Sequence, residues 1–213
     1  LVMAHSALLA YGGYAHSPTL NEPSHLVAGL SHWKFRRFEL YRVNPPLVRI
    51  IAAIPVIASG YDEDWSDFYE GPGARPVFNM AENFAAANAE RLYFLIMLAR
   101  WACIPLSLVG AIVSYRWASD LFGRRAGILA ATLWCTSPNL VGHASLITAD
   151  AHAASLGLAS CYMFRRWLRH PTWSRSAITG VVLGAALLTK TTLILLCPLW
   201  PLLWLVYRWP HRR

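Results

Sequence analysis

Charged residues are scarce in this 213-residue chain, and acidic residues are almost confined to its first half. Charged side chains make up 14% of the sequence and hydrophobic ones 56%, whereas a soluble globular chain carries roughly 25% charged residues. So high an apolar content excludes a disordered chain, and the lack of charged heptads excludes a coiled coil. The composition predicts an integral membrane protein.

Cysteine is rare as well, with four residues that all lie inside apolar runs: Cys103, Cys135, Cys161 and Cys197. None falls in a polar loop, so a secreted domain held together by disulfides is not expected. HExxH, CxxC and glycine-rich nucleotide-binding motifs are all missing from the sequence. We therefore expect no cofactor, and the sequence leaves open whether a divalent metal ion binds.

The net charge of +8 would suit a nucleic-acid partner, but its distribution argues against one. Nine of the eleven acids precede residue 91, and the later basic residues form short clusters between apolar runs. Such clusters mark the cytoplasmic ends of membrane spans. They contain ten arginines, which we expect to face the cytoplasm: Arg116, Arg124, Arg125, Arg165, Arg166, Arg169, Arg175, Arg208, Arg212 and Arg213. Residues 138–150 and Lys190 then face the opposite side.

Crossing a membrane takes about 20 apolar residues in a helix. The apolar runs predict an all-α protein, a polytopic bundle of transmembrane helices that forms one module over residues 1–213. The predicted spans are 1–14 (truncated), 93–116, 125–143, 147–164, 176–190 and 191–207. Lys190 is expected at the bend between the last two. Because the sequence opens inside an apolar run, we expect a fragment of a longer protein.

Residues 15–90 differ in kind, since they are polar, contain many prolines and glycines, and hold most of the acids. They predict a long outer loop with short helices at 22–34 and 46–59 and an irregular stretch at 60–80. The second helix opens on a Pro-Pro pair and is too short to span, so it is predicted to be amphipathic and to lie at the membrane interface.

Ionisable groups at the outer ends of the spans are the candidates for chemistry, because such groups are costly in lipid and usually serve a site or a paired partner. The candidates are Asn21, Glu22, His25, Arg91, Arg100, His143, Asp150, His152 and Lys190. Asp150 is the one acid in the sequence after Asp120. It either serves a site or is a carboxylate at the start of a helix that interacts favourably with the helix dipole. Lys190 either binds an anionic headgroup or is an interfacial lysine that extends its ammonium to the membrane surface. Arg100 either serves a site or has a structural role, paired with Asp150 or with a backbone carbonyl.

Glu22 and His25 lie three residues apart, so they share a face of the predicted helix. A carboxylate just after a span suits a general base. The alternative is a first-turn acid in a helix that Thr19 or Asn21 caps. A zinc site is not expected, because no third ligand accompanies the two residues.

Four stretches of sequence occur together in the chain. In order they are SPTLNEPSHLVAGLSHWKF, YRVNPPLVRIIAAIPV, SPNLVGHASLITADAHAASLGLASCYMF and GVVLGAALLTKTTLILL. Together they resemble the N-terminal part of a C-type (GT-C) membrane glycosyltransferase, in the family of dolichyl-phosphate-mannose–protein mannosyltransferases and bacterial aminoarabinose transferases. The resemblance implies that a sugar passes from a polyprenyl-phosphate donor to a lipid, glycan or protein acceptor on the outer face. The predicted topology, for its part, indicates the cytoplasmic (inner) membrane if the source is bacterial.

The family usually begins its first outer loop with Asp-Glu and takes the Asp as the base, whereas this chain has Asn21-Glu22. Since an amide cannot accept the proton, the resemblance implies that Glu22 or Asp150 substitutes or that the chain is inactive. Lys190 matches the family's phosphate-side lysine. The expected substrate-binding residues are Asn21, His25, Arg91, Arg100, His143 and Lys190. A degenerate lipid-phosphosugar-binding protein and a transporter are the alternatives.

Overall fold

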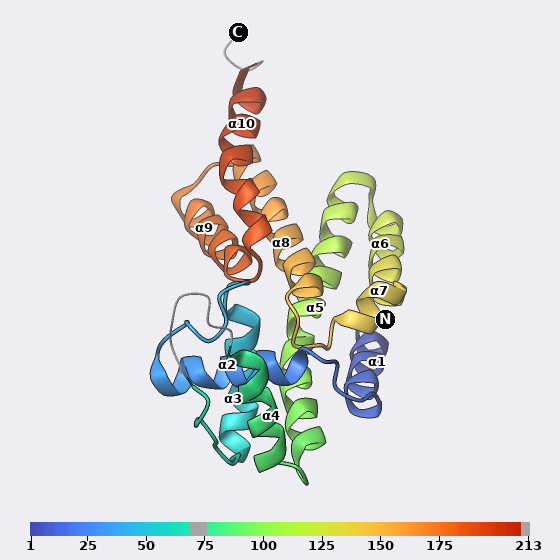
Figure 1. The fold of residues 1–213 in the computed structure, drawn as a ribbon. Coiled ribbons are helices and arrows are strands. Elements are labelled where there is room, and N and C mark those ends of the chain that lie inside the picture. The colour runs from blue at the N-terminus through green and yellow to red at the C-terminus, as the bar shows by residue number, and fades with distance from the viewer. Residues whose placement is uncertain (69–75, 210–213) are drawn as a thin grey trace.

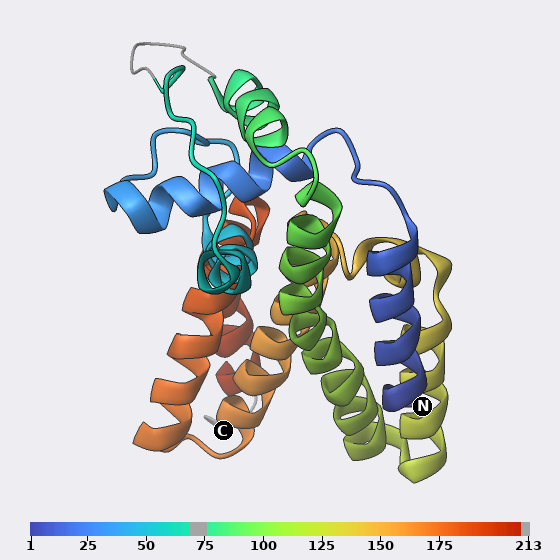
Figure 2. The ribbon, with the colours of Figure 1, turned by 90° about the horizontal axis from the view of Figure 1, so that it is seen from below.

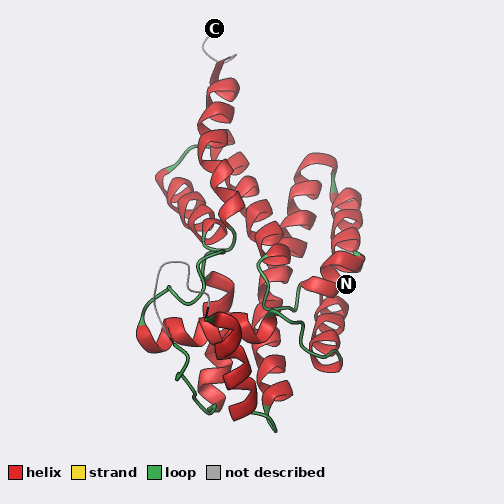
Figure 3. Cartoon of the chain, viewed as in Figure 1, coloured by secondary structure: helices red, strands yellow, loops and turns green. Residues whose placement is uncertain are grey.

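The structure is a computed structural model that describes residues 1–68 and 76–209, and every regular element in those residues is a helix (Figure 1, Figure 3). The predicted all-α class is therefore confirmed. In chain order the elements are α1 (Val2–Ala15), α2 (Glu22–Phe35), α3 (Leu47–Ser59), α4 (Val77–Ala87), α5 (Leu92–Phe122), α6 (Arg124–Thr136), α7 (Pro138–His143), α8 (Asp150–Arg169), α9 (Trp173–Leu187), the 3-10 helix η1 (Thr191–Leu195) and α10 (Leu196–Arg208).

Helix α5 is the central element, against which α1, α2, α3, α6 and α8 pack. Its 31 residues extend about 46 Å, more than the roughly 30 Å of a bilayer's hydrocarbon core. Within the described residues, two stretches are long and apolar enough to cross a membrane, Leu92–Phe122 and Thr191–Arg208. Seen from below, α1 and α6 lie on one side of α5, and α8 and α9 on the other (Figure 2).

Helices α2, α3 and α4 form a layer at one end of α5, and their apolar side chains share one core with its first turns (Figure 1). The sequence reasoning missed α4 and was wrong in treating residues 77–80 as irregular. Val77, Met80 and Phe84 follow Pro76 at helical spacing, and all three are buried. Of the predicted irregular stretch 60–80, residues 69–75 lie outside the described residues.

A glycine sets how closely α2 and α3 approach. A Cβ atom on Gly29 would lie 2.3 Å from the carbonyl oxygen of Arg49, which is closer than real Cβ contacts come. The two backbones therefore touch at Gly29, and this contact fixes Arg49 in the first turns of α3 against the middle of α2.

The segment 125–143, predicted as one span, is divided into α6 and α7 at Ser137. Ser137 has φ −59° and ψ 122°, outside the helical region, because a residue before proline is disfavoured there. Pro138 then begins α7 as its first residue. A second break falls between α9 and η1, where Lys190 has an extended backbone with φ −148° and ψ 133°.

Candidate active site

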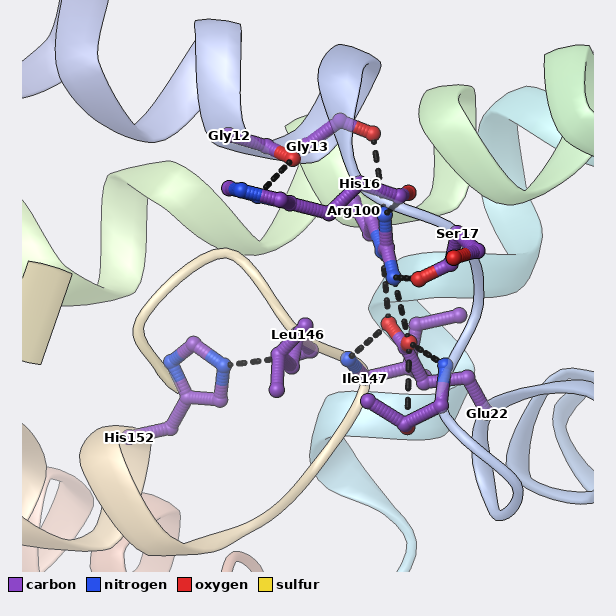
Figure 4. A network of polar contacts seen from close by, with 10 residues as sticks. Gly12, Gly13, His16, Ser17, Glu22, Arg100, Leu146, Ile147 and His152 are labelled. Atoms are coloured by element: carbon purple, nitrogen blue, oxygen red, sulfur yellow. Dashed lines mark hydrogen bonds and ion pairs between the residues drawn. The ribbon is translucent and has the colours of Figure 1, made fainter. Parts of the chain in front are cut away.

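Arg100 lies inside α5 and has an acceptor for each N–H of its guanidinium (Figure 4). Its Nε and Nη2 donate to the two carboxylate oxygens of Glu22 at 2.8 and 2.6 Å. Its Nη1 donates to the carbonyls of Gly13 and His16, and its Nη2 also to that of Ser17. The side chains of Arg100 and Glu22 are 1% and 0% exposed. This pair holds the α1–α2 connection and the start of α2 against α5.

Three further donors complete the surroundings of the Glu22 carboxylate. Oε2 accepts from the amide and hydroxyl of Thr19 at 2.8 and 3.1 Å, and Oε1 accepts from the amide of Ile147 at 3.3 Å. Burial alone would raise the pKa of Glu22, but the hydrogen bonds from Arg100, Thr19 and Ile147 together lower it. Glu22 is therefore a buried, ionised carboxylate whose two oxygens accept five hydrogen bonds.

The sequence left open a pair between Arg100 and Asp150 or a carbonyl. The carbonyl contacts are confirmed, but the carboxylate that Arg100 binds is Glu22 and not Asp150. Asn21 is exposed and forms no capping hydrogen bond with its side chain. Thr19 and Glu22 instead make half of a T-x-x-E capping box, because the Glu22 carboxylate reaches back to the Thr19 amide.

Asp150 is paired with Lys190, 40 residues further along the chain. The Nζ of Lys190 lies 2.5 Å from Oδ1 of Asp150, and the two side chains are 33% and 69% exposed. Asp150 is the first residue of α8, and Lys190 lies in the break before η1. The fold thus brings an accessible carboxylate and an ammonium together at the ends of two helices.

Residues 43–47, which end at the first residue of α3, lie against the segment that carries Lys190. The amide of Leu47 donates to the carbonyl of Leu188 at 2.9 Å, and the hydroxyl of Thr191 donates to the carbonyl of Val43 at 3.4 Å. These two bonds bracket Lys190 and place it beside the N-terminal end of α3.

His25 lies in α2 between charged groups of the site. Its side chain is 8% exposed, and its ring meets that of Tyr41 edge-on with centroids 4.9 Å apart. Burial and then the positive charge of Arg49 lower the pKa of His25 to about 4, against the opposing charges of Glu22 and Asp150. The imidazole is neutral at pH 7, and both carboxylates are close enough to act on it.

Two of the other candidates, Arg91 and His143, are not gathered with these residues. Arg91 is exposed at the start of α5 and donates to the carbonyl of Ser59 at 3.2 Å, and His143 is exposed at the end of α7. His152 is fully buried in α8, where its Nε2 donates to the carbonyl of Leu146 (Figure 4). Within the described ranges, no group of three His, Cys, Asp or Glu side chains is arranged to hold a metal ion.

Arg49, which the sequence reasoning did not select, lies in the same region. Its side chain is 4% exposed, its Nη2 donates to the carbonyl of Asn44 at 2.7 Å, and its guanidinium lies 4.2 Å from the ring centroid of Tyr41. The signal was present in the sequence, because Arg49 is the single charge in LVRIIAAIPVIAS, just as Lys190 is in its own apolar run.

Part of the site lies in a stretch of the chain that matches a known protein family. The profile described as dolichyl-phosphate-mannose-protein mannosyltransferase matches residues 91–213, more than half of the chain. No curated protein and no solved structure gives a match. The match assigns the chain to the class of C-type membrane glycosyltransferases. The chain belongs to the dolichyl-phosphate-mannose-protein mannosyltransferase family. Asp150, Lys190 and Arg100 lie inside the matched region, and Glu22 lies outside it.

Proposed function

We propose that this protein transfers a sugar from a polyprenyl-phosphate donor to a hydroxyl acceptor, with Asp150 as the general base and Lys190 as the cation beside the donor phosphate. The observation that carries the proposal is the accessible ion pair between them, 2.5 Å long, inside the family-matched region. A carboxylate that takes a proton and a cation that stabilises a departing phosphate are the two groups that this reaction needs.

In the proposed step the acceptor oxygen attacks the anomeric carbon of the donor sugar. A new carbon–oxygen bond forms there, the bond to the phosphate oxygen breaks, and polyprenyl phosphate leaves with the electron pair. The acceptor proton passes to the carboxylate of Asp150. The donor phosphate competes with Asp150 for the ammonium of Lys190, so donor binding frees the carboxylate that the acceptor requires.

Glu22, the other candidate base, is better suited to a positioning role. Its carboxylate already accepts five hydrogen bonds, two of them from Arg100, and no water-exposed surface remains on its side chain. A base must have a lone pair within reach of the acceptor proton. We therefore assign Glu22 and Arg100 to holding the 144–149 segment, and with it Asp150, in place.

We also propose a multi-pass arrangement in which the layer of α2, α3 and α4 faces the outer side. The α5–α6 and α8–α9 connections lie at the end of the molecule opposite that layer, and most of the clustered arginines lie in the helix ends that these connections join (Figure 1). Short arginine-rich connections stay in the cytoplasm as a rule. Asp150 and Lys190 then lie on the outer side, where a lipid-linked donor presents its sugar. In a bacterium this membrane is the inner one.

A second candidate function, binding of a lipid-linked sugar without transfer, is favoured by Asn21. Its exposed amide occupies the position at which the family usually has the base, and an amide cannot take up a proton. If Asp150 does not replace that base, the chain binds the donor and turns nothing over.

The experiment that separates the two candidates follows release of polyprenyl phosphate in membranes that contain the full chain. The donors are polyprenyl-phosphate mannose and polyprenyl-phosphate aminoarabinose. We expect release by the unchanged protein and a loss of roughly 10²- to 10⁴-fold in kcat for Asp150→Asn. Lys190→Ala should weaken both donor binding and turnover, because a cation beside the phosphate acts in both states.

Asp120→Asn is the matched control, because Asp120 accepts from Tyr162 near the far end of α5. Its turnover should stay unchanged. Donor binding without release by the unchanged protein would favour the binding-only function, and full activity of Asp150→Asn would reject Asp150 as the base.

A further inference from the structure

Arg100 and Arg49 are both almost fully buried, but they differ greatly in the number of hydrogen bonds that their guanidinium groups form. Arg100, 1% exposed, has five hydrogen bonds, and two of them go to a carboxylate. Arg49, 4% exposed, has one hydrogen bond, to the carbonyl of Asn44, and its Nε finds no acceptor in the part of the chain that the structure describes. A buried cation without a counter-charge is costly, so its retention needs a ligand that supplies the charge.

The surroundings of Arg49 favour an anion. Tyr41 covers one face of the guanidinium, and His25, which is neutral at pH 7, lies close enough for its pKa to respond to the charge of Arg49. The N–H donors of a guanidinium lie in its plane, so stacking on Tyr41 orients them without occupying them. The Nδ1 of His25 is likewise buried without a partner among the described residues.

The position of Arg49 connects it to Lys190. Arg49 donates to the carbonyl of Asn44, and Val43 and Leu47 bind the segment around Lys190 through Thr191 and Leu188. The side chain of Arg49 and the segment that carries Lys190 are therefore both bound to one short stretch of backbone, residues 43–47. Two cations arranged in this way suit a phosphate, which a guanidinium can bind with two parallel N–H donors.

We infer that Arg49 is a second ligand of the donor's phosphate and acts together with Lys190 across residues 43–47. This inference rests on the proposed function and extends it to a residue on a different helix. Arg49 then supplies a fixed, permanently charged contact, and Lys190 exchanges Asp150 for the phosphate. The buried guanidinium obtains its counter-charge when the donor is bound.

The test measures binding to the purified full chain in detergent with three probes: farnesyl phosphate, uncharged farnesol and inorganic phosphate. The readout is the ratio of the affinities for farnesyl phosphate and farnesol, which isolates recognition of the phosphate from that of the tail. Competition by inorganic phosphate shows whether the anion alone is enough or the lipid must carry it.

For Arg49→Gln we expect farnesyl phosphate to bind about tenfold more weakly or worse, with farnesol unchanged, because a hydrogen bond to a charged group is lost. Arg42→Gln is the matched control, since Arg42 is an exposed arginine in the α2–α3 connection that donates to the carbonyl of Glu39. Its ratio should stay that of the unchanged protein. Arg49→Lys should give an intermediate ratio, because an ammonium keeps the charge but loses the two-donor fork.

An unchanged ratio in Arg49→Gln would overturn this inference alone and leave the proposed function standing. Equal weakening of farnesol and farnesyl phosphate would assign Arg49 a structural role and would also overturn it. An unchanged protein that does not distinguish the two probes would overturn both proposals. If Arg49→Gln does not fold, Arg49→Lys decides, because an unchanged ratio in that variant contradicts a phosphate ligand at residue 49.

Discussion

The backbone amide of Ile147 donates to the carboxylate of Glu22 at 3.3 Å, although 125 residues separate the two in the chain. The same carboxylate is bound by Arg100, so one buried ion pair on α2 and α5 also holds the segment that leads into Asp150. The position of the accessible Asp150 thus depends on the buried pair of Glu22 and Arg100. This relationship determines what substitutions on either side should do.

Glu22→Gln should cost about 3–5 kcal/mol of stability, because it leaves the buried guanidinium of Arg100 without its counter-charge. The midpoint of thermal unfolding in detergent measures this loss. Glu39→Gln, at a carboxylate paired near the surface with Arg37, should change the midpoint little. An unchanged midpoint together with abolished turnover in Glu22→Gln would instead identify Glu22 as the base.

Asn21→Asp restores the Asp-Glu pair that is usual in the family. Because Asn21 is exposed and its side chain forms no cap, the substitution should change stability by less than about 0.5 kcal/mol. If Asp150 is the base, turnover of polyprenyl-phosphate sugars should stay close to that of the unchanged protein. Activity that arises only in Asn21→Asp would mean that the natural chain binds its donor without transferring the sugar.

Cysteine labelling tests the proposed orientation in the membrane. Single cysteines at Ser66, after α3, and Ser174, at the start of α9, in a chain whose four native cysteines are replaced, should react from opposite sides with a membrane-impermeant reagent. The reason is the asymmetry of arginines between the short connections. Labelling of both positions from one side would reject the orientation.

Stability should fall as the pH drops from about 6.5 to about 4, because burial lowers the pKa of both His25 and His32 to about 4 in the folded protein. Above pH 6.5 both states hold neutral imidazoles. Below it the unfolded chain takes up protons that the folded chain cannot, at a cost of up to about 3 kcal/mol for each histidine. Unfolding midpoints across this range measure the slope.

The control for the pH dependence is the double variant His25→Gln and His32→Gln, which should reduce the slope of the curve between pH 6.5 and 4.5. Glu22 adds little slope there, because its contribution is lost between its ordinary pKa of 4.5, which applies to the unfolded chain, and the lower pKa that it has in the folded protein. A curve that keeps its slope in the double variant would assign the dependence to other groups.

The amino-acid sequence by itself determined the helical class, the short helices at 22–34 and 46–59 and the family. These features follow from local information: the lengths of apolar runs, Pro-Pro before α3, and arginine clusters between runs. The same local patterns held the signals for α4 and for the break at Ser137. Helix α4 was missed because it lies within the polar stretch 15–90. The break at Ser137 was missed because residues 125–143 form a continuous apolar run.

The tertiary structure decided which charges meet. Glu22, Arg100, Asp150 and Lys190 were all visible as candidates, but the sequence does not say that Glu22 binds Arg100 and that Asp150 binds Lys190. Partner choice depends on how α2, α5, α8 and the break before η1 pack, because a buried charge is held by whichever opposite charge and carbonyls the packing brings within reach. For the same reason only the folded chain reveals that Arg49 is buried without a carboxylate partner in the described residues.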